Sequence, residues 1–183
     1  PARCHRRRPR THCSETDLDA LIDVLTVADV GAGTLATLLR RYGLELVLQA
    51  TGEEITGSFW GDSEAGVVGL KVYVRPDTPV HSFLHESCHV ICMDGERRRC
   101  LDRDAGGDDL EEAAVCYLQV LLADEIPGGG RDRLMADMDA WGYSFRLGDT
   151  CSWFEQDADD ARQFLLEHGL IDANEVPQFR LRA

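Results

Sequence analysis

The sequence predicts an α+β fold in which a small antiparallel sheet is followed by several helices. Apolar and polar residues alternate, as in half-buried strands, mainly between residues 44 and 74, whereas from residue 79 the apolar residues recur with the period of a helix. The chain has 183 residues, of which 44% are hydrophobic and 28% charged, the composition of an ordinary globular protein. We therefore expect one domain with an α+β architecture.

The first expected elements are two helices. Residues 14–17, Ser-Glu-Thr-Asp, are typical of a helix start, and apolar residues follow at helical spacing as far as Leu25. A second, short helix is expected over residues 35–42. It should end at Gly43, because glycine readily adopts the left-handed conformation that closes many helices.

Three strands are expected after these helices, over residues 44–48, 55–60 and 67–74. In the last segment Leu70 and Val72 alternate with polar neighbours, which is the pattern of a strand with one buried face. Turn-forming residues separate the three segments. Short connections of this kind favour an antiparallel meander.

Helical patterns return after the strands. Thr78 followed by Pro79 is typical of a capped helix start, and the apolar pattern continues to Cys92. A polar loop rich in arginine and aspartate is expected over residues 94–108. Further helices are expected over residues 109–124, 131–140 and 156–168.

Charge is distributed unevenly along the chain. The formal net charge is -14, yet residues 1–13 are rich in arginine and contain no acidic residue. We expect this segment to be a disordered basic tail and residues 14–183 to form the domain. The strongly acidic remainder repels nucleic-acid phosphates and anionic lipids, so neither nucleic acid nor a membrane is expected as a partner.

Cysteine usage and hydropathy favour a particular compartment. The seven cysteines are an odd number with no paired spacing, and no secretory signal is recognised. No apolar run approaches the roughly 18 residues of a membrane-spanning helix. We therefore expect a cytoplasmic protein whose thiols are reduced. Nothing in the sequence indicates an oligomeric state.

The helix expected over residues 79–92 contains an H-E-x-x-H motif, which runs from His85 to His89. Residues four apart lie on one face of a helix, so both imidazoles can point at a single ion. Zinc accepts nitrogen ligands readily and lowers the pKa of a bound water from 15.7 to about 7. Glu86 lies beside the pair and can accept a proton from such a water. The spacing thus predicts two zinc ligands and a general base.

Other interpretations of the same helix stay open at this point. Two buried, hydrogen-bonded histidines on an amphipathic helix would show the same spacing without a metal. Cys88 or Cys92 could join the histidines in a structural zinc site, although three ligands on one helix give poor tetrahedral geometry. His81 extends the histidine stripe by one turn, and we expect it to be a polar residue of the first turn rather than a ligand.

A third ligand is expected from the helix that begins at Asp109. An H-E-x-x-H motif followed by a glutamate on a later helix resembles the gluzincin group of zinc metallopeptidases. Within that group, residues 83–122 look most like the ImmA/IrrE family, whose ligand glutamate is followed by alanine three residues on, an aromatic six on and then paired leucines. Counted from Glu111, these positions hold Ala114, Tyr117, Leu121 and Leu122.

The resemblance implies a zincin-like metallopeptidase domain that holds one Zn²⁺ per chain and hydrolyses a peptide or protein substrate. The metal ligands would be His85, His89 and Glu111, with Glu86 as the general base. Glu112 is the alternative third ligand, although it would put Val115 at the alanine position. The rival function is a non-catalytic binding or regulatory module with a structural or vestigial zinc site.

Two further segments carry functional hypotheses. Residues 97–99 are three arginines, which we expect to be solvated, with capture of an anionic peptide end as the alternative. Trp141, Tyr143 and Arg146 are expected in the core or in the wall of a cleft. A tyrosine or arginine there could stabilise an oxyanion.

Overall fold

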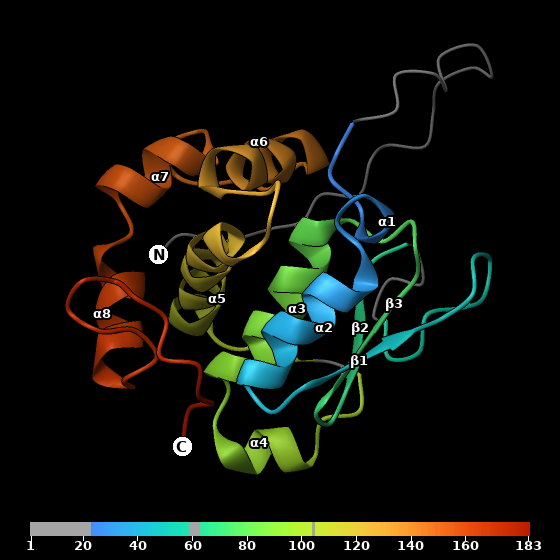
Figure 1. The fold of residues 1–183 in the computed structure, drawn as a ribbon. Coiled ribbons are helices and arrows are strands. Elements are labelled where there is room, and N and C mark those ends of the chain that lie inside the picture. Colours follow the sequence, from blue (N-terminus) through green and yellow to red (C-terminus); the bar gives the residue numbers. More distant parts are fainter. Residues whose placement is uncertain (1–22, 59–62, 104) are drawn as a thin grey trace.

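Helix α3 (Val80–Cys92) lies at the centre of the molecule, between a small sheet and the other long helices (Figure 1). The computed structural model describes residues 23–58, 63–103 and 105–183. Within these residues the chain forms a three-stranded sheet and eight α-helices, so the α+β class expected from the sequence is confirmed. The segment 1–13, expected as a basic tail, lies outside the described residues.

The sheet is mixed rather than antiparallel. Its strands are β1 (Glu45–Leu48), β2 (Gly66–Val68) and β3 (Lys71–Val74), and their order in the sheet is β1-β3-β2. β3 pairs antiparallel with β2 and parallel with β1. The expected antiparallel meander is therefore wrong, because β3 inserts between the two earlier strands instead of adding to the edge of the sheet.

The segment 67–74, expected as one strand, belongs to the hairpin of β2 and β3. Gly69 has a φ of 58°, a left-handed conformation that glycine adopts at little steric cost, and with Leu70 it turns the chain. The turn leaves Leu70 45% exposed, so the apolar alternation that passes through it does not mark a continuous strand. The strand expected over 55–60 is absent from its described part, residues 55–58.

Helices α1 (Val27–Val30) and α2 (Ala32–Arg41) lead into β1. α2 confirms the expected short helix, and Gly43 beyond it has a φ of 73°. The earlier helix, expected from residue 14, lies mostly outside the described residues. Its last expected residue, Leu25, is not helical.

α3 is buried on almost every side. Glu86 is its single residue that is not buried, and the helix packs against the sheet and against helices on its other faces. The hydroxyl of Thr78, expected to cap α3, instead accepts a hydrogen bond from the backbone amide of Arg75 at 2.9 Å. Thr78 therefore stabilises the turn before α3 rather than the helix itself, which begins directly after Pro79.

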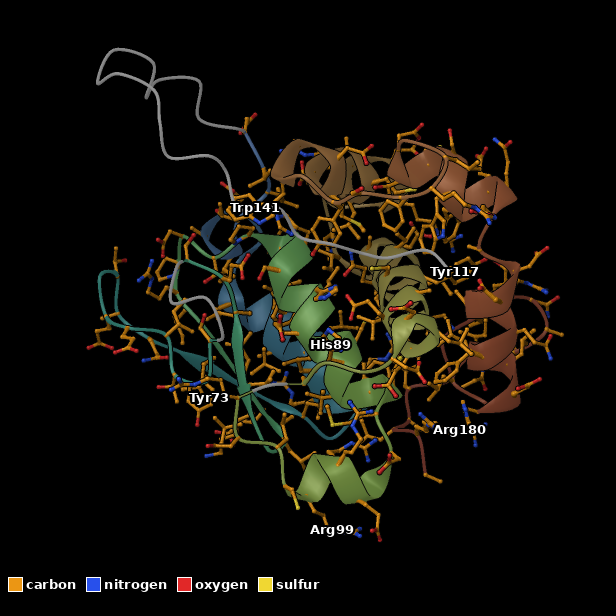
Figure 2. The ribbon with its side chains drawn as sticks, turned by 180° about the vertical axis from the view of Figure 1, so that it is seen from behind. Tyr73, His89, Arg99, Tyr117, Trp141 and Arg180 are labelled. Atoms are coloured by element: carbon orange, nitrogen blue, oxygen red, sulfur yellow. The ribbon has the colours of Figure 1, made fainter. Side chains whose placement is uncertain are left out.

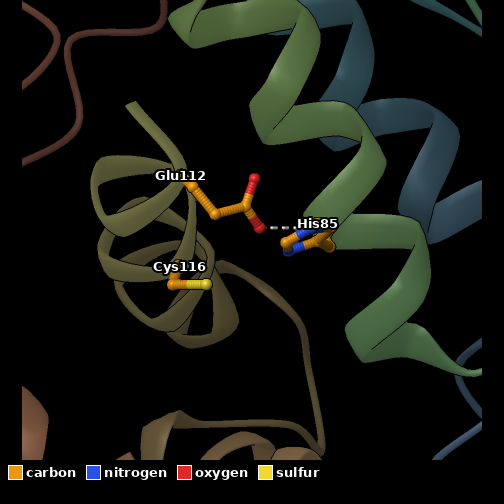
Figure 3. A group of neighbouring side chains, drawn as sticks. All are labelled: His85, Glu112 and Cys116. Carbon is orange, nitrogen blue, oxygen red and sulfur yellow. Dashed lines mark ion pairs between the residues drawn. The ribbon is translucent and has the colours of Figure 1, made fainter. Parts of the chain in front are cut away.

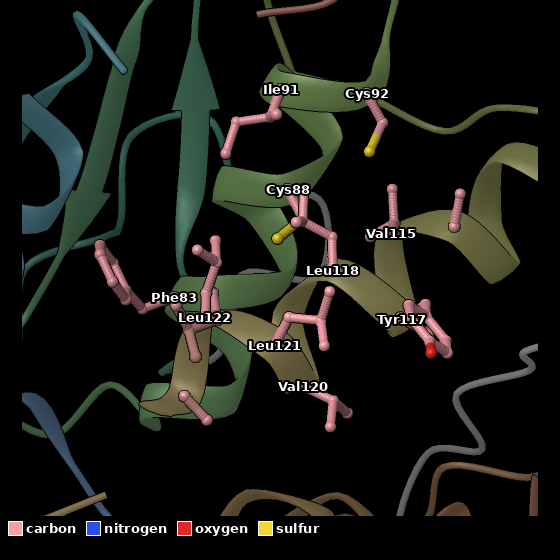
Figure 4. Packing of buried hydrophobic residues seen from close by; sticks show 14 of the residues in the cluster. Phe83, Cys88, Ile91, Cys92, Val115, Tyr117, Leu118, Val120, Leu121 and Leu122 are labelled. Carbon is pink, nitrogen blue, oxygen red and sulfur yellow. The ribbon is translucent and has the colours of Figure 1, made fainter. Parts of the chain in front are cut away.

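Helix α5 (Asp109–Leu122) follows the expected bounds and continues as a 3-10 turn through Glu125. The Asp108 carboxylate caps α5, because it accepts hydrogen bonds from the amides of Leu110 and Glu111. α5 packs along α3, and buried apolar side chains of both helices form one cluster (Figure 4). The cluster includes Cys88 and Cys92 of α3 and Val115, Leu118 and Leu122 of α5.

The remaining helices surround this pair. They are α4 (Gly95–Arg99), α6 (Arg131–Trp141), α7 (Thr150–Gln156) and α8 (Asp159–Glu167). α6 and α8 confirm expected helices, whereas α4 lies in a segment expected as a loop and α7 was not expected. Both of these short helices begin after an aspartate whose side chain accepts from first-turn amides. Over the described ranges, no helix combines the length and apolar character that crossing a bilayer requires.

A close backbone contact at β2 gives a test of the fold. A Cβ atom at Gly66 in β2 would lie 2.2 Å from the carbonyl oxygen of Thr56. We expect Gly66→Ala to lower the free energy of unfolding by about 2 kcal/mol or more, since the backbone has to move. In the control Gly33→Ala, on α2, no atom lies within 4 Å of the added Cβ, so stability should rise by about 0.5 kcal/mol. Urea denaturation measures both, and an unchanged midpoint for Gly66→Ala would contradict this close approach.

Candidate metal centre

Two histidines of α3 bring ring nitrogens together in the interior. His85 and His89 are one helical turn apart, and their rings lie 4.6 Å from each other at an angle of 87°. The two Nε2 atoms are 3.1 Å apart. Both residues are buried, with 3% and 5% of their surface exposed. The H-E-x-x-H spacing thus directs both imidazoles to a common point.

The carboxylate of Glu112, on α5, faces both histidines. Its Oε1 lies 3.3 Å from Nε2 of His85 (Figure 3), and its Oε2 lies 3.3 Å from Nε2 of His89. Nitrogen and oxygen ligands bonded at about 2.0–2.1 Å to a tetrahedral zinc ion are about 3.3 Å from one another. The separations of 3.1 to 3.3 Å are therefore close to those of ligands around one zinc ion, with each imidazole facing a different oxygen of the carboxylate.

A buried glutamine orients His85. Nδ1 of His85 lies 2.9 Å from Oε1 of Gln119, which is also on α5 and has no exposed surface. The amide of Gln119 donates to Sδ of Met138, which leaves its oxygen to accept from the imidazole. In the neutral imidazole this acceptor favours the tautomer with its proton on Nδ1, whose Nε2 lone pair can bind a metal ion. A partner on the far ring nitrogen is typical of histidines that bind metals.

Glu111, the expected third ligand, makes different contacts. Its carboxylate accepts two hydrogen bonds from Nη1 of Arg97, at 2.7 and 2.9 Å, and one from Nη1 of Arg182 at 3.1 Å. Only 4% of Glu111 is exposed, so its buried charge is balanced by two guanidinium groups. The structure thus brings Glu112, and not Glu111, to the two histidines.

The helical period explains which glutamate faces α3. Successive residues of an α-helix are rotated by about 100°, so Glu111 and Glu112 point in different directions. Glu112, Cys116 and Gln119 stand at positions i, i+4 and i+7 of an otherwise largely apolar helix, which places them on one stripe. The spacing of these three residues can be read from the sequence. The comparison with the ImmA/IrrE family does not use it, because that comparison is counted from Glu111.

Cys116 was not anticipated as part of the site. Its Sγ forms a group with His85 and Glu112 in which all the ligand atoms lie within 4.8 Å of one another. Figure 3 shows the Cys116 side chain one turn along α5 from Glu112. The thiol is buried, so it is both a core residue and a candidate metal ligand.

The two cysteines that the sequence pointed to, Cys88 and Cys92, pack in the apolar core. Both are wholly buried on α3. Burial raises the pKa of each thiol, and the carboxylate of Glu111 raises the pKa of Cys92 further. Neither belongs to the group of His85, Glu112 and Cys116 whose ligand atoms lie within 4.8 Å of one another, so the structure does not bring them to the site.

Glu86 has the contact with solvent that the rest of α3 lacks. It directly follows His85, so its side chain leaves the helix about 100° around from that of the histidine. It is also the single residue of α3 that is not buried. A carboxylate in this position can exchange protons with water beside the histidines, as the general base of an H-E-x-x-H site must.

Aromatic side chains pack around the amino-terminal end of the histidine stripe. The ring of Tyr143 lies 5.7 Å from that of His85 and 5.6 Å from that of His81, edge to face in both pairs. The ring of Trp141, whose position at the end of α6 is shown in Figure 2, lies 5.0 Å from His81. His81 does lie in the first turn of α3, as expected, and its side chain is a fully buried member of an aromatic cluster.

Arginines considered for binding or catalysis make structural contacts instead. Arg97 binds Glu111, and Arg98 donates to two backbone carbonyl oxygens around the end of α3. The run of three arginines is thus not simply solvated, and two of its members hold the site helices in place. Arg146 pairs with Asp157 through a hydrogen bond of 2.8 Å. Of the two residues considered for oxyanion stabilisation, Tyr143 is therefore the one whose ring packs beside His85.

No protein-family model, curated protein or solved structure matches this chain. The chemical interpretation of the site therefore rests on its own residues. Two imidazoles and a carboxylate meet at one point, with a thiol close by and a second carboxylate in contact with solvent. These donors suit zinc, whereas calcium and magnesium prefer oxygen ligands alone.

Removal of the glutamine that orients His85 tests whether the site binds metal. We expect Gln119→Leu to weaken zinc binding by about 10- to 100-fold, because His85 loses the acceptor that fixes its tautomer. Competition with a chromophoric chelator measures this affinity. Gln163→Leu is the control, since the side-chain amide of Gln163, on α8, is exposed and donates to exposed Glu167. Equal zinc affinity in both variants would mean that Gln119 does not position a ligand.

Proposed function

We propose that this protein is a zinc-dependent hydrolase of peptide bonds. His85, His89 and Glu112 would hold one zinc ion per chain, and Glu86 would be the general base. The observation that carries the proposal is the convergence of three donor groups from two helices at the mutual distances of zinc ligands. The partly exposed Glu86 beside them supports a catalytic role over a purely structural one.

The donor set fits zinc in charge as well as in number. Two neutral imidazoles and one carboxylate leave a net positive charge on a divalent ion, which favours polarisation of a carbonyl oxygen. Catalytic zinc sites commonly use three protein ligands and leave the fourth position to water or substrate. The side chain of Glu112 is 22% exposed, so this side of the site is in contact with solvent.

The residues of this chain have separate tasks in the proposed reaction. Bound zinc would supply a water of lowered pKa and a Lewis acid for the scissile carbonyl. Glu86 accepts the proton of the attacking water and delivers it to the leaving amine. Gln119 holds His85 in the tautomer whose Nε2 lone pair is available, and Tyr143 packs edge-on against the same ring.

A peptide substrate is the expectation from the resemblance to gluzincins. The residues themselves support only metal-assisted hydrolysis of some carbonyl compound, whose transition state develops negative charge on oxygen. The formal charge of -14 favours a neutral or basic peptide over an acidic one, because like charges repel at long range.

A non-catalytic module is the second candidate function, and the contacts of Glu112 favour it. A carboxylate that bridges two histidines can also be a buried hydrogen-bonded network that stabilises the contact between α3 and α5 without turnover. The two candidate functions differ in the role of Glu86, because a structural zinc site does not require a general base. Zinc content and turnover together therefore separate them.

The adjacent glutamates form a matched pair for metal analysis. We expect Glu112→Gln to weaken zinc binding by more than about 100-fold, since an amide replaces a charged ligand. Glu111→Gln should keep about one zinc per chain but lose about 3 kcal/mol of stability, because Arg97 and Arg182 lose a buried counter-charge. Metal mass spectrometry and urea denaturation give the two readouts. Zinc lost from Glu111→Gln and kept in Glu112→Gln would return the ligand role to Glu111.

Substitution of the proposed base tests catalysis itself. We expect Glu86→Gln to retain zinc and to lose at least about 100-fold in the rate of peptide hydrolysis, since glutamine cannot accept the proton. Mass spectrometry of products from a mixture of unstructured peptides measures the rate. Glu54→Gln, at an exposed position, controls for the change of charge. Undiminished turnover in zinc-loaded Glu86→Gln would exclude this mechanism, and zinc binding without turnover in the unmodified chain would favour the non-catalytic module.

A further inference from the structure

We propose that Cys116 is a fourth protein ligand of the zinc ion, so that the resting site is closed and hydrolysis requires the thiolate to leave. The inference rests on the proposed function, because it assigns a regulatory state to the same site. It arises from the position of Cys116 on α5, one turn after Glu112 and on the same face of the helix.

Two helices each present two donors separated by one turn. α3 offers His85 and His89, and α5 offers Glu112 and Cys116, both pairs at positions i and i+4. Because α3 and α5 pack against each other, Glu112 faces both histidines, and Cys116 lies in one group with His85 and Glu112. Two pairs from different helices can occupy the four corners of a tetrahedral zinc site, whereas three ligands from a single helix would be crowded on one side of the ion.

The thiol is close enough to reach the ion through a small movement. The ligand atoms of His85, Glu112 and Cys116 all lie within 4.8 Å of one another. Across a tetrahedral zinc ion, with bonds of about 2.3 Å to sulfur and about 2.0–2.1 Å to nitrogen, the two ligand atoms are about 3.6 Å apart. For His85 and Cys116 the remaining gap is therefore at most about 1.2 Å. Rotation of the cysteine side chain and a slight shift of α5 can close such a gap.

Binding of Cys116 changes what the site can do. The thiol releases its proton to solvent, and the thiolate takes the position that water or substrate would occupy. Structural zinc sites have four protein ligands, whereas catalytic sites keep one position for exchange. With Cys116 bound the centre is of the structural kind, and with Cys116 displaced it is of the catalytic kind, next to Glu86.

X-ray absorption at the zinc edge tests this inference on the unmodified, zinc-loaded chain. Sulfur at about 2.3 Å is distinguishable from nitrogen and oxygen ligands at about 2.0–2.2 Å. We expect one sulfur together with nitrogen and oxygen ligands in the first coordination shell. A shell of nitrogen and oxygen alone would overturn the proposal, and this result needs no variant that might unfold.

Two alanine variants assign the sulfur to a residue. Cys116→Ala should lack the sulfur signal and bind zinc about tenfold or more weakly. Cys88→Ala is the matched control, because it removes another wholly buried thiol of the same cluster but leaves the proposed ligand in place. It should keep both the sulfur signal and the zinc affinity. A sulfur signal that persists in Cys116→Ala would overturn the assignment.

Peptide hydrolysis by the same preparations separates this inference from the proposed function. Saturated with zinc, Cys116→Ala should hydrolyse peptides faster than the unmodified chain, because no thiolate competes for the fourth position. Zinc–sulfur bonding with no hydrolysis by either protein would contradict the proposed function and leave Cys116 as a ligand. Hydrolysis by the unmodified chain with no sulfur in the shell would support the proposed function and contradict the role of Cys116.

Discussion

The candidate site depends on the close packing of α3 against α5. The contact is mainly apolar, yet it encloses a polar stripe from each helix, with His85 and His89 on one side and Glu112 and Gln119 on the other. Buried polar groups are costly unless each finds a partner, so the two stripes must be in register. Apolar packing therefore sets the distance between the helices, while the polar pairs set how the helices are rotated and aligned.

Counter-charges from outside α5 give two neighbouring glutamates different surroundings. Arg97 of α4 and Arg182 enclose Glu111, and the backbone amide of Arg182 also donates to the carbonyl oxygen of Ile91 near the end of α3. Residues far apart in sequence thus join the ends of α3 and α5 on one side of the helix pair. Glu112, one residue on, faces the histidines. Of the two adjacent glutamates, Glu111 therefore pairs with arginines and Glu112 contributes to the candidate site.

Local patterns were sufficient to predict some parts of the molecule and insufficient for others. α3 and α5 followed from helical period and termini, and the pairing of His85 with His89 followed from their spacing alone. The mixed sheet could not be predicted in this way, because strand order depends on contacts between β1 and β3 that local alternation does not encode. The choice between Glu111 and Glu112 likewise required the rotation of α5 about its axis, which is fixed by its partners.

Glu86 is the single residue of α3 that is not buried, so the helix that carries the histidines has almost no solvent-exposed surface. A molecule that approaches this helix from solvent meets mainly one carboxylate, because the imidazoles of His85 and His89 are only 3% and 5% exposed. Selectivity for one molecule over another must then be encoded in the segments that border Glu86. Under the proposed function, the reactive groups and the choice of target would therefore diverge independently in evolution, because substitutions at the border need not disturb the buried helix.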